Sequence, residues 1–378
     1  MDNLTEKDLN ILRKYGFDKD TFEELRTKIQ KGELTEEHNI EKRKIEPPPK
    51  ESLIKFPEKN STEWTEFEEK GKQAIRNGEF ALAILNGGMA TRFGGKVKGI
   101  INVVKDVSFL ELKIRHAKKI ADECGGKIPI LLMNSWATEN ATLKHLEEKN
   151  YFDIPKEEYF MFSQYLWPRI TLDGNIYRQD DGTPSFYGPG HGDFPIALKK
   201  KGGLDWLKKK GIKYMLVANV DNLGAKVDPV VLGLHIKMGK EATVEVAEKW
   251  PGDQGGCPAL INGKIQILEG FRFPKDYDQD QIDVFNCNTF TFTINAFEKE
   301  FHLPFYVVKK KIGKDVFIQF ERLIGEVTGF LDCIYLVVPR TGKSNRFYPV
   351  KTPKDLEEAK DIINLLYPEY AEEGEFQR

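Results

Sequence analysis

Long apolar runs, an excess of one charge and closely spaced cysteines are all lacking from this sequence of 378 residues. No apolar run approaches the roughly 20 residues that a membrane-spanning helix requires, so we expect no membrane segment. Lys and Arg number 57 against 59 Asp and Glu, a balance that argues against a nucleic-acid binder, which usually has a basic face. The first residues, M-D-N-L-T-E-K-D, are polar and acidic, unlike a signal peptide.

The four cysteines are Cys124, Cys257, Cys287 and Cys333, and no two of them form a C-x-x-C pair. This scatter predicts neither a disulfide framework nor a zinc site. Free thiols are typical of proteins in a reducing compartment, so we predict a cytoplasmic location.

Short apolar segments alternate with helical patterns through the middle of the chain. Residues 81–85, 128–133 and 214–220 are apolar runs that end in polar residues or glycine, as buried strands do. Helical patterns cover residues 111–123 and 137–149. This alternation predicts an α/β fold with a doubly wound, mostly parallel, Rossmann-like sheet.

We divide the chain into three parts. Residues 1–78 are expected to form helices and a linker, and residues 79–340 the main α/β domain. Within that domain, residues 240–268 and 284–294 have a β-rich pattern with glycine turns. Residues 341–378 form a short C-terminal segment with a helical pattern.

The loop after the first apolar run has the composition of a phosphate-binding site. Gly87 and Gly88 lack a Cβ atom, so their backbone N–H groups can approach an anion. Arg92 and Lys98 add positive charge, and Lys96 is a further cation whose role the sequence does not decide. A Walker loop is excluded because Ala90 occupies the place of its first glycine. The loop therefore predicts polyphosphate binding of another type.

This loop resembles the signature of nucleotidyltransferases that make nucleotide sugars, G-G-x-[GA]-T-R-[LF]-G followed by a lysine. Further matches resemble the UDP-sugar pyrophosphorylase family, and most closely its eukaryotic-type UTP–glucose-1-phosphate uridylyltransferase branch. In chain order these are Asn134-Ser135, Gln164, Pro168-Arg169, Gly190-His191-Gly192-Asp193, Asn219 to Ala225, Gly255-Gly256, Leu268-Glu269, Asn286-Cys287-Asn288 and Arg346 to Thr352. They extend over most of the chain.

The resemblance implies a Mg²⁺-dependent enzyme that converts UTP and glucose 1-phosphate to UDP-glucose and pyrophosphate. Two alternatives remain open: a broad enzyme that also accepts galactose or N-acetylglucosamine 1-phosphate, and a catalytically silent UDP-sugar-binding regulator. Eukaryotic relatives continue into a β-helix domain, for which the residues after Thr352 leave no room, so we expect none. The oligomeric state stays open, and no nucleic acid or membrane partner is expected.

The resemblance also assigns charged residues to the phosphates and the metal. Lys98 and Arg92 would hold the triphosphate and stabilise the leaving pyrophosphate. Lys351 would contact phosphate from the C-terminal side, although an exposed cation is its alternative interpretation. Asp221 would bind Mg²⁺ at the end of an apolar strand.

The remaining assignments concern the base and the sugar. Gln164 would recognise the uracil edge through its amide. Gly87, Gly88, Gly190 and His191 would contact the nucleotide, whereas Asp193 is interpreted as a cap of the following helix. The expected contacts of the sugar phosphate and the sugar are Asn219, Gly256, Glu269, Asn286 and Asn288. The two last-named asparagines stand at i and i+2, a spacing that places both side chains on one face of a strand.

Overall fold

The structure is a computed structural model that describes residues 4–253 and 255–370. Its α-helices are α1 (Glu6–Lys14), α2 (Lys19–Gln30), α3 (Thr62–Arg76), α4 (Phe109–Cys124), α5 (Glu139–Glu148), α6 (Phe194–Lys200), α7 (Gly203–Lys209), α8 (Pro229–Met238), α9 (Pro353–Glu358) and α10 (Lys360–Leu366). Short 3-10 helices that matter for the site are η4 (Lys98–Ile100), η7 (His191–Asp193), η8 (Gly270–Arg272) and η11 (Ile324–Gly329). Within the described ranges, no helix is both long enough and apolar enough to span a membrane.

The strands are β1 (Ile45–Glu46), β2 (Leu53–Lys55), β3 (Phe80–Leu85), β4 (Met89–Ala90), β5 (Lys96–Val97), β6 (Asn102–Val104), β7 (Val107–Ser108), β8 (Ile130–Asn134), β9 (Tyr159–Ser163), β10 (Trp167–Pro168), β11 (Phe186–Tyr187), β12 (Tyr214–Asn219), β13 (Ala242–Glu248), β14 (Cys257–Ile261), β15 (Lys264–Leu268), β16 (Val284–Thr293), β17 (Tyr306–Ile312), β18 (Asp315–Glu321) and β19 (Cys333–Val337). The runs expected to be strands correspond to β3, β8 and β12, and the helical patterns between them to α4 and α5.

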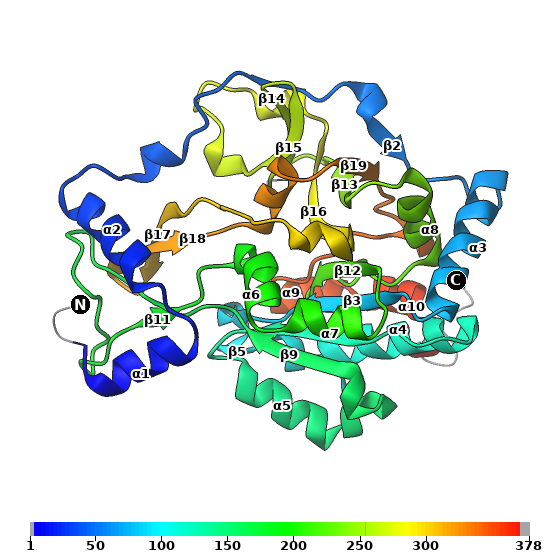
Figure 1. Cartoon of the computed structure of the whole chain (residues 1–378), viewed down its shortest axis with the longest axis horizontal. Coiled ribbons are helices and arrows are strands. Elements are labelled where there is room, and N and C mark those ends of the chain that lie inside the picture. Colours follow the sequence, from blue (N-terminus) through cyan, green and yellow to red (C-terminus); the bar gives the residue numbers. More distant parts are fainter. Residues whose placement is uncertain (1–3, 254, 371–378) are drawn as a thin grey trace.

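The centre of the molecule is an eight-stranded sheet in the order β2-β19-β13-β16-β12-β3-β8-β9 (Figure 1). Neighbouring strands are parallel except for β16, which is antiparallel to both β12 and β13. The predicted α/β class with a mostly parallel sheet is therefore confirmed. The doubly wound, Rossmann-like order stays a prediction.

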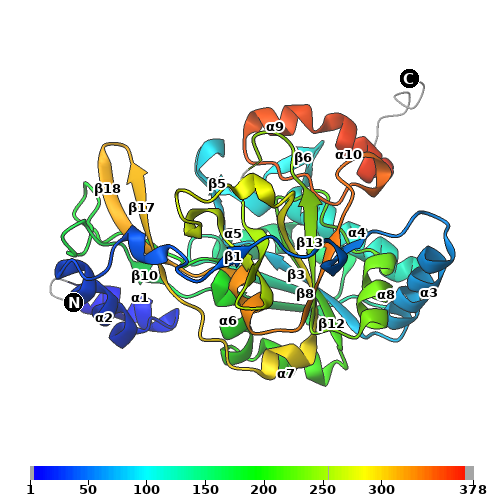
Figure 2. The ribbon, with the colours of Figure 1, turned by 90° about the horizontal axis from the view of Figure 1, so that it is seen from above.

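Both faces of the sheet are covered, which explains why β3 is apolar throughout. Ala81, Ala83 and Leu85 belong to one hydrophobic core, and the alternate residues Leu82 and Ile84 belong to a second. Helices α6 and α7 contribute to the first core, whereas α4 and α10 contribute to the second. Figure 2 shows α7 and α10 on opposite sides of β3 and β12. A strand buried on both faces needs no polar alternation.

The N-terminal residues are joined to the rest of the molecule at several points. Phe22 on α2 contacts Trp167 with its ring edge, at 5.5 Å between ring centroids. The following connection crosses above β14 (Figure 1), where β1 pairs with β14, and β2 then pairs with β19 at the edge of the central sheet. The division at residues 78 and 340 stays a prediction.

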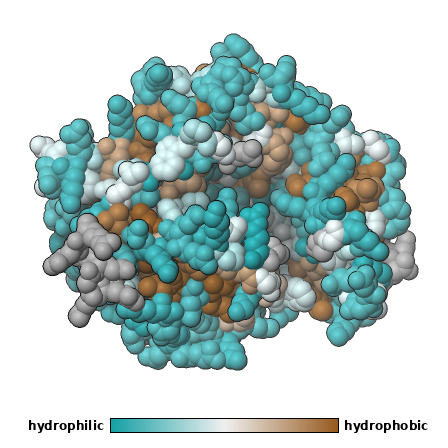
Figure 3. All heavy atoms as spheres, turned by 180° about the vertical axis from the view of Figure 1, so that it is seen from behind, coloured by the Kyte–Doolittle hydropathy of each residue, from teal (hydrophilic) through white to brown (hydrophobic). Residues whose placement is uncertain are grey.

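One face of the molecule is dominated by polar groups. Seen from behind, it is mostly hydrophilic, with smaller hydrophobic areas between (Figure 3), as expected for a sequence in which 31% of the residues are charged. Hydrophobic side chains instead fill the two cores on either side of the sheet.

Candidate active site

The loops that follow β3 and β12 meet because these two strands are parallel neighbours. Their pairing aligns Leu85 with Asn219, so the residues after both strands emerge at the same edge of the sheet. Lys98 Nζ donates a hydrogen bond to Asp221 Oδ2 at 2.7 Å. The two side chains are only 13% and 21% exposed. The predicted phosphate lysine and the predicted metal ligand thus form an ion pair.

The glycine-rich loop is folded back on itself by the pairing of β4 with β5. The backbone N–H of Lys98 donates to the carbonyl oxygen of Gly88 at 3.2 Å. Gly94 and Gly95 in the turn both have φ of +76°, a conformation that favours glycine. Arg92 and Lys96 are exposed, so of the three cations in this loop the structure brings Lys98 to Asp221.

Gln164 is buried between two glycines from different loops. A Cβ atom on Gly87 would lie 3.1 Å from Gln164 Nε2, and one on Gly188 would lie only 1.8 Å away. The residue is 8% exposed. The backbone of Gly188 lies so close to the Gln164 amide that no side chain would fit at position 188. Gly188 was not predicted as a site residue. This geometry suits an amide held rigidly for recognition.

The loop of residues 190–193 packs on the protein itself. Ile324 N donates to His191 Nδ1 at 2.9 Å, and burial lowers the pKa of His191 to about 4. The imidazole is therefore neutral near pH 7, with its proton on Nε2. Gly190, with φ of +108°, has no space for a Cβ because the carbonyl oxygen of Arg322 would be 2.6 Å away.

The expectation that Asp193 caps the next helix is wrong. Its carboxylate makes no cap hydrogen bond to α6. It is fully buried and pairs instead with the guanidinium of Arg322, at 2.5 Å between Oδ1 and Nη2. A buried carboxylate with a buried arginine partner is satisfied away from the helix end.

Three asparagines at the end of β12 and near the start of β16 are joined by hydrogen bonds. Asn288 Nδ2 donates to Asn219 Oδ1 at 3.1 Å, and the backbone N–H of Asn288 donates to Asn286 Oδ1 at 3.0 Å. The pairing of β13 with β16 shifts by a bulge here, and Asn288 has φ of +52°. Bulges are common next to active sites because they redirect side chains.

Gly256 and Glu269 are also neighbours. A Cβ on Gly256 would lie 3.0 Å from the carboxylate of Glu269. The backbone N–H of Asn286 donates to the carbonyl oxygen of Gly256 at 2.7 Å, which joins this pair to the asparagines. Burial, with a smaller contribution from the negative charge of Glu326, raises the pKa of Glu269 to about 7.

Lys351 is exposed, and its neighbour contacts the centre of the site. The backbone N–H of Val350 donates to the carbonyl oxygen of Asp221 at 3.0 Å. The backbone N–H of Lys351 donates to Asp355 Oδ2 at 2.7 Å. The Val-Lys-Thr stretch therefore reaches the metal-binding candidate from the C-terminal side.

Two buried cations that support the loop after Asp221 were not predicted. Lys113 on α4 donates to the carbonyl oxygens of Asn222 and Ala225 at 2.6 and 2.7 Å, and burial lowers its pKa to about 7. Arg346 pairs with Glu245 on β13. A lysine in the apolar start of α4 was a sequence signal for the first of these. Arg346 lay within a matched motif, but its partner is 101 residues away.

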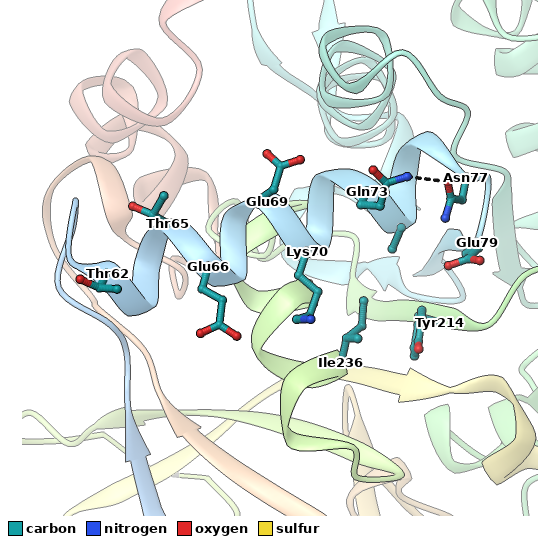
Figure 4. A pocket seen from close by; sticks show the side chains of 11 residues that line it. Thr62, Thr65, Glu66, Glu69, Lys70, Gln73, Asn77, Glu79, Tyr214 and Ile236 are labelled. Carbon is teal, nitrogen blue, oxygen red and sulfur yellow. Dashed lines mark hydrogen bonds between the residues drawn. The ribbon is translucent and has the colours of Figure 1, made fainter.

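One surface hollow lies away from these residues. Figure 4 shows one of about 700 Å³ beside α3, lined also by Glu79, Tyr214 and Ile236. Glu79 immediately precedes β3 and Tyr214 begins β12, so this hollow is at the amino ends of the strands. None of the predicted site residues lines it, and binding in α/β sheets occurs at the opposite ends.

Two known proteins are similar to this chain in sequence. UTP–glucose-1-phosphate uridylyltransferase 2 of Dictyostelium discoideum is 31% identical over 332 residues, covering 83% of this chain and 63% of that protein. The uridylyltransferase of Solanum tuberosum is 31% identical over 288 residues, covering 72% and 59%. The chain thus spans about three fifths of the length of these relatives.

Solved structures and a family model complete the comparison. The UDP-N-acetylglucosamine pyrophosphorylase of Trypanosoma brucei has a TM-score of 0.73 at 20% identity, covering 94% of this chain and 84% of that one. The UDP-glucose phosphorylase of the same organism has a TM-score of 0.72 at 24% identity, covering 92% and 76%. These two likenesses show the fold. The model of the UTP–glucose-1-phosphate uridylyltransferase family matches residues 19–365, and the chain belongs to that family.

Proposed function

We propose that the protein transfers the uridylyl group of UTP to glucose 1-phosphate. An oxygen of the sugar phosphate would bond to the α-phosphorus of UTP as the bond to the β-phosphate bridging oxygen breaks, releasing pyrophosphate. The observation that carries the proposal is the Lys98–Asp221 pair at the carboxyl ends of β3 and β12. In the sheet order β16-β12-β3-β8-β9, the pair belongs to the strands between β16, which carries Asn286 and Asn288, and β9, which directly precedes Gln164.

The residues fit the needs of this reaction. A phosphomonoester has a second pKa of about 6, so the attacking oxygen is ionised near pH 7 and no general base is required. The reaction instead needs charge neutralisation and in-line alignment. Lys98 would neutralise the triphosphate, and the exposed Arg92 and Lys351 would be further cations.

A divalent cation fits the site through Asp221. Within the described residues, no group of at least three His, Cys, Asp or Glu side chains could hold a metal by itself. Mg²⁺, however, is usually held by one or two carboxylates together with substrate phosphates. Asp221 is partly exposed at a strand end and offers such a carboxylate. When bound, Mg²⁺ would neutralise phosphate charge there.

Asp221→Asn is expected to lower the rate of pyrophosphate release by about 100-fold and to raise the Mg²⁺ concentration that gives half the maximal rate. The amide keeps the shape of the side chain but loses its charge. A Mg²⁺ titration of the initial rate would test this. Asp205→Asn, an exposed change on α7, is the control. An unaltered Mg²⁺ dependence in Asp221→Asn would remove the residue from the metal site.

Gln164→Ala is expected to lower the preference for UTP over CTP, measured as the ratio of kcat/KM values, by about tenfold. The two bases differ at the edge that an amide can recognise through its donor and acceptor. Gln73→Ala, an exposed change on α3, should leave the ratio unaltered. If Gln164→Ala also leaves it unaltered, the base is recognised elsewhere.

The KM for glucose 1-phosphate is expected to rise by roughly threefold as the pH falls from about 8 to 6, because Glu269 gains a proton and accepts hydrogen bonds from sugar hydroxyls less well. Its pKa of about 7 places the change in that window.

The same raised pKa also affects stability. Glu269 stabilises the folded state most at pH values below 4.5, its ordinary pKa, and this contribution is lost as the pH rises through about 7.

Steady-state kinetics of Glu269→Gln would isolate this effect. The phosphate of glucose 1-phosphate titrates equally in assays of the wild-type protein and of Glu269→Gln. Only the difference between their pH profiles is therefore caused by Glu269. Identical profiles would show that Glu269 does not contact the sugar as a carboxylate.

The proposed function itself is tested by pyrophosphate release with UTP and Mg²⁺ and a panel of glucose, galactose and N-acetylglucosamine 1-phosphates. Release with glucose 1-phosphate alone supports the specific enzyme, whereas release with several supports a broad UDP-sugar pyrophosphorylase. Binding of UDP-glucose without release from any member of the panel would contradict catalysis and leave a UDP-sugar-binding regulator.

A further inference from the structure

The segment of residues 322–326, here called the bridge, contacts both sides of the candidate site. It follows β18 and includes the first residues of η11. No residue of the bridge was predicted to act in the site. Its first residues contact the loop of residues 189–193, on the nucleotide side, and its last residues contact Glu269, on the sugar side.

On the nucleotide side the contacts are made mainly by the backbone. Arg322 N donates to the carbonyl oxygen of Pro189 at 2.7 Å, and Gly192 N donates to that of Arg322 at 3.0 Å. Ile324 N donates to His191 Nδ1 at 2.9 Å. A Cβ on Gly192 would lie 2.4 Å from the bridge backbone, so the two segments are in direct contact.

A buried ion pair joins the bridge to Gln164 as well. Arg322 Nε and Nη2 both donate to Asp193 Oδ1, at 3.0 and 2.5 Å. The other carboxylate oxygen of Asp193 accepts from the backbone N–H of Tyr165 at 3.0 Å. Tyr165 is the residue directly after Gln164, so the position of the amide depends on the same pair.

On the sugar side the bridge lies beside Glu269. A Cβ on Gly325 would lie 3.4 Å from Glu269 Oε1. The next residue, Glu326, accepts from Arg272 Nη1 at 2.7 Å, and Arg272 N donates to the carbonyl oxygen of Glu269 at 2.9 Å. The side chains of Glu326 and Arg272 are only 9% and 11% exposed.

We infer that the bridge positions Glu269 from the nucleotide side, so that His191 is a positioning residue for the sugar as well as a neighbour of the nucleotide. The inference rests on the proposed function. Its physical reason is that only one residue separates the His191 contact at Ile324 from the Arg272 contact at Glu326. Close-packed interiors transmit a displacement over so short a distance.

The test uses equilibrium binding of UDP and UDP-glucose to the full chain, measured by calorimetry. The ratio of the Kd for UDP to the Kd for UDP-glucose reports what the sugar contributes. His191→Ala removes the acceptor of Ile324 N, and we expect the ratio to fall by about threefold or more. Gln164→Ala is the matched control, because it shortens a side chain that lies against Gly87 and Gly188 and leaves the bond between the Tyr165 backbone and Asp193 in place. It should weaken both ligands and leave the ratio unaltered.

Gly325→Ala tests the bridge from its other end. The added methyl would lie 2.8 Å from Ile267 Cγ2 and would displace the bridge next to Glu269. We expect UDP, which has no sugar, to bind about threefold more weakly, a result that a purely local role of Gly325 would not give. Circular dichroism would confirm that each variant is folded.

Equal weakening of both ligands in His191→Ala, or unaltered UDP affinity in Gly325→Ala, would overturn the inference while leaving the proposed function intact. If the wild-type protein bound neither ligand, the proposed function would fail and the inference with it. The two failures are therefore distinguishable.

Discussion

Replacing Lys98 by alanine is expected to lower kcat for pyrophosphate release by about 1,000-fold. Removing one preorganised donor from a site where charge develops costs on the order of 100- to 1,000-fold, and a full positive charge next to a triphosphate belongs at the upper end. Lys98 Nζ is held 2.7 Å from Asp221, so it is already fixed at the carboxyl ends of β3 and β12. Initial rates at saturating UTP, glucose 1-phosphate and Mg²⁺ would measure the loss.

Lys96→Ala is the matched control because Lys96 lies in the same loop and is exposed. Its rate should stay within about threefold of the wild-type rate, as expected for a solvated cation. Thermal unfolding should show that Lys98→Ala remains folded. Near-normal turnover by Lys98→Ala would remove this lysine from the reaction, and equal losses in both variants would show a general effect of loop charge.

The difference between Lys98 and Lys96 shows what the sequence could decide about the site. The strand, the glycine loop and the cations are contiguous, so a local pattern was enough to predict a strand followed by this loop. Which lysine meets Asp221 depends on the pairing of β4 with β5 and of β3 with β12, and no local pattern contains those pairings. Sequence reasoning therefore left Lys96 open.

Sequence analysis missed other features because they depend on contacts between residues that are far apart in the sequence. Gly188 and Gln164 are 24 residues apart in number, yet the backbone of the first fixes the amide of the second. The antiparallel insertion of β16 between β12 and β13 depends on non-local pairing, although the strand itself was expected. The spacing of Asn286 and Asn288 assumed an uninterrupted strand, whereas a bulge with φ of +52° at Asn288 interrupts it.

Arg346→Met is expected to lower the free energy of unfolding by about 3–5 kcal/mol, the cost of leaving a buried charge without its partner. Arg346 Nη2 and Nε donate to the two carboxylate oxygens of Glu245 at 2.6 and 2.8 Å. The side chains are 3% and 0% exposed, so water cannot replace the lost partner. Urea unfolding followed by circular dichroism would measure the change.

Lys118→Met is a useful control, because Lys118 pairs with Asp122 at the surface of α4. Its loss should change the free energy of unfolding by less than about 1 kcal/mol. The double variant Glu245→Met with Arg346→Met should recover most of the loss, because both fully buried charges are removed together and Asp228, the other partner of Arg346, is 25% exposed to water. A loss below about 1 kcal/mol in Arg346→Met alone would contradict the account.

Arg346 also connects stability to the site. Its carbonyl oxygen accepts from Asn222 Nδ2 at 3.4 Å, and Asn222 Oδ1 accepts from the backbone N–H of Tyr348 at 2.8 Å. These bonds hold the residues that directly follow Asp221. Arg346→Met should therefore raise the Mg²⁺ concentration that gives half the maximal rate, even in protein that remains folded. The double variant should regain stability. Its Mg²⁺ requirement should return toward that of the wild type to the extent that the residues after Asp221 regain their positions.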